Sequence, residues 1–343
     1  MFKNSSKLLF LITLISGTLI TVSSNSWLSA WMGLEINLLS LIPLMMNYNS
    51  PMASEASLKY FLVQALASTI LLFSMILMMF SINMDWYYTE FNMMYPAMIN
   101  SCLLLKMGAA PFHFWSPGVM EGLSWTNNFI LMTWQKIAPL MLISYLILPN
   151  LFSMIIFLSI LIGSLGGLNQ TSLRKIMAFS SINHLGWMLA AMLSNNNLWE
   201  FYFSIYTFLT LTILILFDML KIFHINQTFF IMNNYPLIKF LMFTLLLSLG
   251  GLPPFLGFAP KWLVIQFMTM NNNILLVIIM VSLTLITLYY YIRICYASFL
   301  INYWEINWFN KIQLNPLKLF TLSFLSFISM TGILLINSSY FLI

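Results

Sequence analysis

The sequence predicts an all-α integral membrane protein with about eleven membrane-spanning helices. Its 343 residues are 61% hydrophobic and only 6% charged, whereas an ordinary soluble domain carries roughly a quarter charged residues. Its apolar runs are also mostly long enough, at about 20 residues each, to cross a bilayer as helices. These two observations exclude a soluble fold and leave no room for a soluble domain. A third observation, the distribution of basic residues, supports the number of helices.

Eleven apolar segments are separated by polar residues, proline or glycine. They cover residues 8–24, 26–46, 57–82, 95–110, 126–147, 150–168, 173–193, 199–221, 236–268, 274–300 and 317–341. The ninth is too long for one straight span, and Gly250-Gly251-Leu252-Pro253-Pro254 at its centre cannot continue a regular helix. The fourth is interrupted in a similar way between Lys106 and His113. We therefore expect broken fourth and ninth helices.

Basic residues collect on one side of the predicted membrane. We call the N-terminal side A and the opposite side B. With the chain threaded back and forth, the B loops carry Asp85, Glu90 and Glu200 and no basic residue. Cationic residues favour the cytoplasmic or matrix side, so side A is expected to be that side. The basic residues in A loops or at A ends of helices are Lys3, Lys7, Lys59, Arg174, Lys175, Lys221, Lys239, Arg293, Lys311 and Lys318.

Four charged residues lie inside spans instead. They are Lys106, Lys136, Lys261 and Glu35. Each costs about 2.5 to 3.5 kcal/mol to insert at the centre of a membrane helix, so their presence favours a function. A proton path is the function we expect, because a buried ammonium and a nearby carboxylate can exchange a proton when their separation changes. The alternative is that these lysines reach an interface or tie helices together.

Histidines and cysteines give weaker signals. Haem or metal ligation would need facing histidines on neighbouring spans, but only His184 lies inside a span. A hydrogen-bonded packing role and a proton-relay role both remain open for His184. Cys102 and Cys295 lie in apolar helix patterns, so we expect neither a disulfide framework nor a thiolate metal site. The net charge of +5 comes from dispersed residues and does not indicate a nucleic-acid partner.

The broken helices suggest an internal repeat. If spans one to five and six to ten are two repeats, each broken helix is the fourth member of its repeat. An odd number of spans makes the repeats inverted, as in many transporters. The expected domains are residues 1–147 and 148–300 for the two repeats, and 301–343 for a loop and a C-terminal transmembrane helix.

Amino-acid usage indicates an organellar gene. Methionine, with 27 residues, and phenylalanine, with 30, are abundant together with isoleucine and asparagine, and A/T-rich codons specify all four. An Arg-rich amphipathic presequence is lacking, which agrees with synthesis inside the organelle. A signal peptide over residues 1–24 is the alternative, although Ser24-Asn25-Ser26 is a weak cleavage site.

Five stretches together resemble the NADH dehydrogenase subunit 2 family of respiratory complex I, of an insect-like type. They read WMGLEIN, LLLKMGAAPFHFW, TWQKIAP, NQTSLRKIMAFSSINHLGW and LSLGGLPPFLGFAPKW. The resemblance implies an antiporter-like fold of two inverted five-helix repeats and proton translocation driven by distant electron transfer. It implies that Glu35 and Lys106 form a charged pair, that Lys136 is the central relay and that Lys261 is the exit-side lysine. Lys175 and His184 are further candidates for the same path.

The resemblance also implies the surroundings of the chain. NADH, FMN, iron–sulfur clusters and ubiquinone are expected in other parts of the complex, with no redox cofactor or metal in this chain. Expected partners are neighbouring antiporter-like and small hydrophobic membrane-arm subunits and lipids. The expected location is the mitochondrial inner membrane, with the N-terminus on the matrix side and the C-terminus on the intermembrane-space side.

Two alternatives and one departure from the family symmetry remain. A stand-alone cation/proton antiporter shares the same chemistry, and a structural membrane subunit with vestigial charges does not need it. The second repeat lacks a charge that matches Glu35, because His184 occupies the comparable seventh span. The sequence therefore does not predict a complete duplicate channel in the second half.

Overall fold

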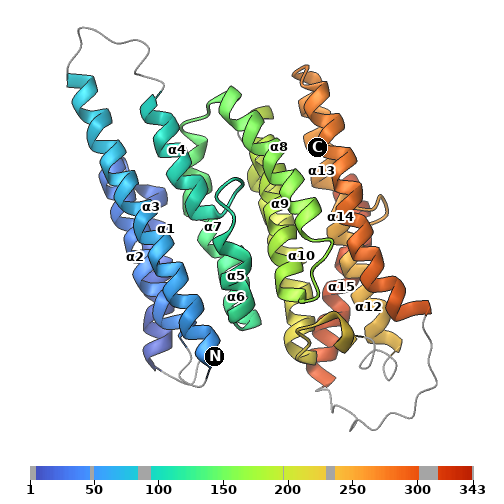
Figure 1. Cartoon of the computed structure of the whole chain (residues 1–343). Helices are drawn as coiled ribbons and strands as arrows, with labels where there is room; N and C mark the ends of the chain where they lie inside the picture. The colour runs from blue at the N-terminus through green and yellow to red at the C-terminus, as the bar shows by residue number, and fades with distance from the viewer. Residues whose placement is uncertain are drawn as a thin grey trace. The chain divides into compact units, whose positions relative to one another are not determined.

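The computed structural model describes residues 5–46, 50–83, 94–195, 197–228, 236–300 and 316–341. The charged residues Lys3, Asp85, Glu90 and Lys311, used above to assign sides, lie outside these ranges. The chain divides into two compact units, Met1–Ile155 and Ile156–Ile343. Each unit is described separately below, with the helix labels of Figure 1.

Long apolar helices dominate the described part of the chain. Seven of the helices there are long and apolar enough to cross a membrane. They cover Ser5–Ser23, Trp27–Met45, Pro51–Phe80, Pro149–Gly166, Leu173–Ser194, Leu198–Leu220 and Ile274–Cys295. Shorter apolar helices lie at Leu237–Gly250 and Leu319–Gly332. The predicted class, a helical integral membrane protein, is confirmed.

The first unit begins with three neighbouring helices, drawn side by side in blue in Figure 1. These are α1 (Ser5–Ser23), α2 (Trp27–Met45) and α3 (Pro51–Asn83). Two glycines let α1 and α2 approach closely: a Cβ atom added to Gly33 would lie 2.8 Å from the carbonyl oxygen of Gly17. Small residues at helix contacts are the usual means of close packing in membranes, where no hydrophobic effect drives helices together. This contact fixes α2, the helix that carries Glu35.

The rest of the first unit contains two helix interruptions. Its helices are α4 (Met94–Met107), α5 (Trp115–Gly122), α6 (Trp125–Met132) and α7 (Trp134–Ser144). The interruption expected after Lys106 is present, because α4 ends at Met107 and Gly108 takes a positive φ of 74°. The short helix α5 was not expected, because it lies between two predicted apolar segments.

The predicted fifth span differs from the structure in a second way. Residues 126–147 were expected to form one helix, but the α-helix is interrupted at Thr133, between α6 and α7. The Thr133 hydroxyl donates to the carbonyl of Phe129 at 2.7 Å, a contact that often bends helices. Pro139, inside α7, removes a further backbone donor. Lys136 therefore lies in the first turn of a new helix.

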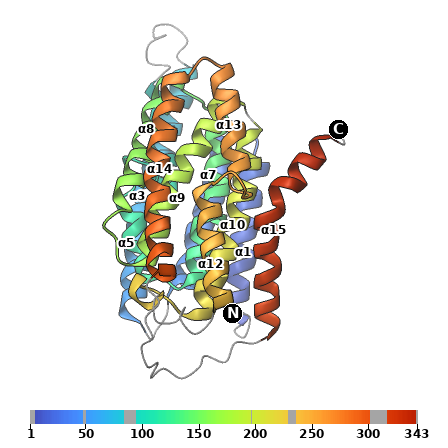
Figure 2. The same cartoon turned by 90° about the vertical axis from the view of Figure 1, so that its right-hand side faces the viewer.

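The second unit surrounds one deeply buried helix. It contains most of α8 (Pro149–Gly166), then α9 (Leu173–Ser194), α10 (Leu198–Leu220), α12 (Pro236–Gly250), α13 (Phe258–Met270), α14 (Ile274–Leu300) and α15 (Pro316–Phe341). Helix α9 is buried over most of its length and contacts α10 and α13. Helix α12 contacts α10, α14 and α15, and Figure 2 shows the red α15 along this side of the unit. The expected ninth-helix interruption is present between Gly250 and Phe258.

The contact between α1 and α2 leads to a prediction about stability. Gly33→Ala should lower the free energy of unfolding by roughly 1 to 3 kcal/mol, because the added methyl group meets the backbone of α1. The measurement is the temperature at which the membrane-extracted protein loses half of its folded fraction. Gly118→Ala is the control, because a Cβ there has no neighbour within 4 Å. Equal melting temperatures for the two variants would contradict the close helix contact.

Candidate functional site

Lys106 lies at the point where α4 stops. It is in the last turn of that helix and is only 7% exposed. The last carbonyl groups of a helix have no partner within the helix and carry partial negative charge, so this position favours an ammonium group. The backbone carbonyl of Lys106 itself accepts a hydrogen bond of 3.1 Å from the buried Gln64 side chain on α3. The interruption thus has a specific polar support from a neighbouring helix.

Glu35 is the acidic neighbour of Lys106. It is half-buried on α2, and its carboxylate acts electrostatically on the Lys106 ammonium. No salt bridge within 4.0 Å joins the two side chains in the described part of the chain. The structure therefore places Glu35 and Lys106 as neighbours that attract each other across a gap, not as a closed ion pair.

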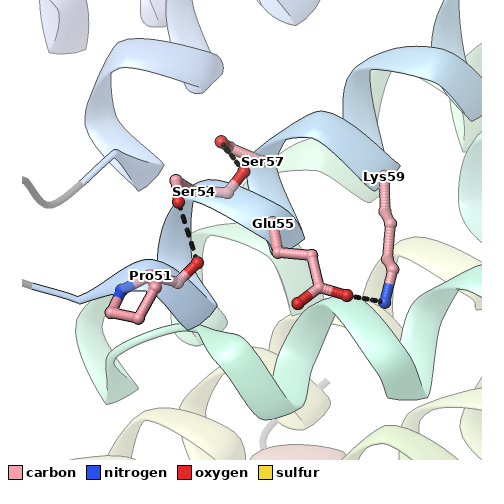
Figure 3. Close-up of polar contacts among 5 residues, drawn as sticks. All are labelled: Pro51, Ser54, Glu55, Ser57 and Lys59. Carbon is pink, nitrogen blue, oxygen red and sulfur yellow. Dashed lines mark hydrogen bonds and ion pairs between the residues drawn. The ribbon is translucent and has the colours of Figure 1, made fainter.

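Among the residues that the structure describes, an ion pair does form at the start of α3. Lys59 Nζ and Glu55 Oε1 are 2.6 Å apart, and Figure 3 shows the two side chains meeting along one turn of the helix. Both side chains are exposed, and an exposed pair of this kind contributes little to stability. The nearby hydroxyls of Ser54 and Ser57 donate to backbone carbonyls of the same helix. This pair is a feature of the helix surface and lies outside the buried set.

Lys136 follows the discontinuity at Thr133. It is 3% exposed, and its backbone N–H donates to the Thr133 carbonyl at 3.1 Å instead of to the residue four positions earlier. On the adjacent Gln135, the side-chain oxygen accepts a hydrogen bond of 3.4 Å from Tyr60 of α3. Lys136 is therefore a further buried lysine beside a helix interruption, a relationship that the sequence alone did not show.

The Lys261 side chain bridges the interruption between α12 and α13 in the second unit. Its ammonium group donates to the carbonyl oxygen of Gly250 at 2.9 Å, from the first turn of α13 to the last residue of α12. The side chain is 6% exposed, and its nitrogen lies 5.9 Å from the centre of the Trp187 ring. Gly251, with φ of 78°, makes the turn between them. A buried charge is tolerated when it finds such acceptors.

His184 lies in the middle of α9 and has a clear partner. Its Nδ1 atom is 2.9 Å from the hydroxyl of Tyr202, and its ring centre is 5.0 Å from that of Tyr206. The contact with Tyr202 gives the buried imidazole a hydrogen-bond partner, as a packing residue needs. It also connects the imidazole to a hydroxyl group, as a proton relay needs. Both predicted roles of His184 are therefore compatible with the geometry. Lys175, the other additional candidate, is half-buried in the first turn of α9.

Two supporting residues were missed in the sequence. Gln64 supports the end of α4, and Tyr202 contacts His184. Gln64 could have been found, because a glutamine inside the apolar run Leu62-Val63-Gln64-Ala65-Leu66 needs a hydrogen-bond partner in a membrane. Tyr202 gave no such signal, because tyrosine is common near the ends of membrane helices. In the described residues, no group of three or more His, Cys, Asp or Glu side chains is arranged to hold a metal ion.

Comparison with known proteins decides the family. The model of the NADH:quinone oxidoreductase/Mrp antiporter transmembrane family matches residues 24–287. The model of the NADH dehydrogenase subunit 2 C-terminus matches residues 288–340. The chain is 58% identical to NADH-ubiquinone oxidoreductase chain 2 of Anopheles gambiae, over 98% of this chain and 99% of the relative. The same comparison with the Aedes aegypti protein gives 57% identity over 99% and 100% of the two chains.

The chain belongs to the NADH-ubiquinone oxidoreductase chain 2 family. The identification made from the five sequence motifs is therefore confirmed, including its insect-like character. The expected assignment to NADH:ubiquinone oxidoreductase is confirmed with it.

Solved structures confirm the antiporter-like fold. The structure of respiratory complex I from Thermus thermophilus with bound aureothin contains a similar chain, with a TM-score of 0.86 at 22% identity. The match covers 96% of this chain and 78% of that one. A chain of the Mrp complex from Dietzia matches with a TM-score of 0.77 at 17% identity, over 95% and 75% of the two chains.

The turn at Gly251 gives a prediction about Lys261. Gly251→Ala should reduce both thermal stability and NADH-driven proton transport, because its Cβ would lie 2.9 Å from Lys261 Nζ. The positive φ adds roughly 1 to 2 kcal/mol of backbone strain for alanine. Gly250→Ala is the matched control, because a Cβ there makes ordinary contacts, with the nearest atom 3.6 Å away. Both variants are measured for melting temperature and for proton uptake by membrane vesicles. Similar losses in both would contradict a specific effect at Lys261.

Proposed function

We propose that this chain carries protons at mid-membrane depth through Glu35, Lys106, Lys136 and Lys261, with His184 and Lys175 as further members of the path. One observation carries the proposal: all three lysines are nearly fully buried, and each lies within about one turn of an interrupted helix. Electron transfer takes place elsewhere in the oxidoreductase, and this chain contributes the membrane part of the coupled reaction.

Helix interruptions suit lysines that gain and lose protons. A carbonyl at a helix end can hold the ammonium form without a fixed negative charge. The uncharged amine also tolerates the same apolar surroundings, so neither form is strongly excluded. Glu35 attracts a proton on Lys106, and a wider separation between them weakens this attraction. Motion of α2 relative to α4 would therefore favour transfer of the Lys106 proton toward Lys136.

The finer architecture belongs to the same proposal. It consists of about eleven spans, with two inverted five-helix repeats at residues 1–147 and 148–300 and a C-terminal segment at 301–343. The similar positions of the interruptions support it, because α4 ends just after Lys106 and α12 ends at the carbonyl that binds Lys261. In both places a glycine with positive φ follows the helix end.

The proposed setting is the mitochondrial inner membrane, with the N-terminus in the matrix and the C-terminus in the intermembrane space. The names of the relatives support the enzyme, and the likeness to a chain of respiratory complex I supports assembly with other membrane-arm subunits and lipids. Basic residues on predicted side A support the orientation. In this proposal the chain binds no redox cofactor, and NADH, FMN, iron–sulfur clusters and ubiquinone are bound by other subunits.

A stand-alone cation/proton antiporter is the second candidate. The likeness to a chain of the Mrp complex and the name of the matching family model favour it. Curated relatives between 41% and 58% identical carry the name NADH-ubiquinone oxidoreductase chain 2, which favours the first candidate. Purification from native membranes discriminates between the two, because the first predicts recovery in a large assembly that oxidises NADH.

The relay is tested by two substitutions in the assembled enzyme. Lys136→Ala and Glu35→Gln should each lower the number of protons translocated per NADH oxidised, because each removes a charged member of the path, while assembly is retained. Lys59→Gln is the control, because Lys59 is exposed and pairs with Glu55 on the helix surface. The readouts are native-gel assembly and dye-detected vesicle acidification. Wild-type pumping in both relay variants rules out the relay and leaves a structural subunit with vestigial charges.

A further inference from the structure

Four tyrosines of the second unit form a buried cluster around α9. Tyr202 and Tyr206 come from α10, and Tyr290 and Tyr291 come from α14. All four are no more than 2% exposed. We call these four residues the tyrosine cluster. The relay described above involves none of its members except Tyr202, through the contact with His184.

Two hydroxyls of the cluster are buried without a direct partner. The rings of Tyr290 and Tyr291 pack edge to face, with centres 4.6 Å apart. Neither hydroxyl makes a hydrogen bond with any residue that the structure describes. The polar neighbours of the Tyr291 hydroxyl are Ser180 of α9 and Tyr290 itself. Buried hydroxyl groups near one another that make no direct bond are the usual setting of an ordered water molecule.

The inner end of the cluster leads to His184. The Tyr291 phenol of α14 is a neighbour of Tyr206 and Tyr202 of α10. Tyr206 has Ser181 as a further polar neighbour. Tyr202 contacts Nδ1 of His184 at 2.9 Å. Phenol groups of α14 and α10 are therefore neighbours, and the last of them, Tyr202, reaches the imidazole in the middle of α9.

The outer end of the cluster reaches the loop between α8 and α9. A Cβ atom added to Gly167 would lie 2.8 Å from Cε1 of Tyr290 and 3.3 Å from Cζ, the carbon that bears the hydroxyl. The next residue, Leu168, accepts a hydrogen bond of 3.2 Å from the exposed Arg293, one turn beyond Tyr290 on α14. The alternation of spans predicts that this loop lies on side A. Tyr290 thus lies between a polar loop and the buried hydroxyls.

We propose that Tyr290 and Tyr291 hold water molecules that connect the loop at residues 167–172 with His184, giving the second unit its own proton branch from side A. The inference rests on the proposed relay and adds a route of supply to it. A tyrosine hydroxyl accepts one hydrogen bond and donates another. A proton that arrives on one side of the oxygen is matched by one that leaves on the other, and rotation of the hydroxyl restores the starting state.

A packing role alone does not require these hydroxyls. Phenylalanine would fill the same space, and it would remove two buried polar groups that have no direct bond. The same helix offers an internal comparison, because Tyr289 precedes the pair and is 59% exposed. Its hydroxyl is the same chemical group on the opposite, outward-facing side of α14.

Three Tyr→Phe variants of the assembled enzyme test the branch. Tyr290→Phe, Tyr291→Phe and the double variant should reduce the protons translocated per NADH oxidised, with the largest loss in the double variant. Assembly should equal that of the wild type, because no direct hydrogen bond is removed. Tyr289→Phe should pump normally. A double variant that assembles and pumps like the wild type overturns the branch.

A second measurement, on the wild-type enzyme, tests the proposal even where the variants fail to assemble. A structure of the wild-type enzyme that resolves water should show density within about 3.2 Å of both hydroxyls. A dry, closed contact around both overturns the proposal. Lys136→Ala measured in parallel separates the two hypotheses. Loss of pumping in Lys136→Ala with normal pumping in the double tyrosine variant contradicts the branch alone, whereas normal pumping in both also contradicts the relay.

Discussion

The structure depends on how a lysine ammonium is accommodated inside a membrane protein. A buried positive charge needs an acceptor, and a regular helix has no free carbonyl groups except at its C-terminal end. Lys261 shows the solution directly, because it donates to the carbonyl of Gly250 where α12 ends. Lys106 lies in the last turn of α4, and Lys136 lies just beyond the discontinuity at Thr133. Each buried lysine therefore lies beside a helix interruption. The interruption provides free carbonyl groups, and the ammonium group gives those carbonyl groups a donor.

An interrupted helix must in turn be supported by its neighbours. Backbone groups freed at an interruption cannot bond to lipid, so other parts of the protein must satisfy them. Gln64 does so for the carbonyl of Lys106, and the Trp115 indole donates to the carbonyl of Leu105 at 3.0 Å. These contacts join α3 and α5 to the end of α4. Close packing in the first unit therefore also supports the helix end that carries the buried Lys106.

The two units surround their lysines with different chemistry. In the first unit a carboxylate, Glu35, acts on Lys106. In the second unit the polar groups near mid-helix are an imidazole and phenols, with His184 bonded to Tyr202. Neutral groups can pass a proton without a permanent charge, and they are less costly to bury than a carboxylate. The second half of the sequence has no counterpart of Glu35, and the structure shows an imidazole and phenols there instead of a carboxylate.

The sequence by itself determined the class, the family, the buried charges and the two main interruptions. Hydrophobic length, the segregation of basic residues and the Gly-Pro runs are local properties, so they can be read along the chain. The interruption before Lys136, the support from Gln64 and the grouping of Tyr202, Tyr206, Tyr290 and Tyr291 could not be read in this way. Gln64 acts on a residue 42 positions away, and the tyrosines come from two helices far apart in the sequence. Such groupings are set by which faces of different helices meet, and only the tertiary structure decides that.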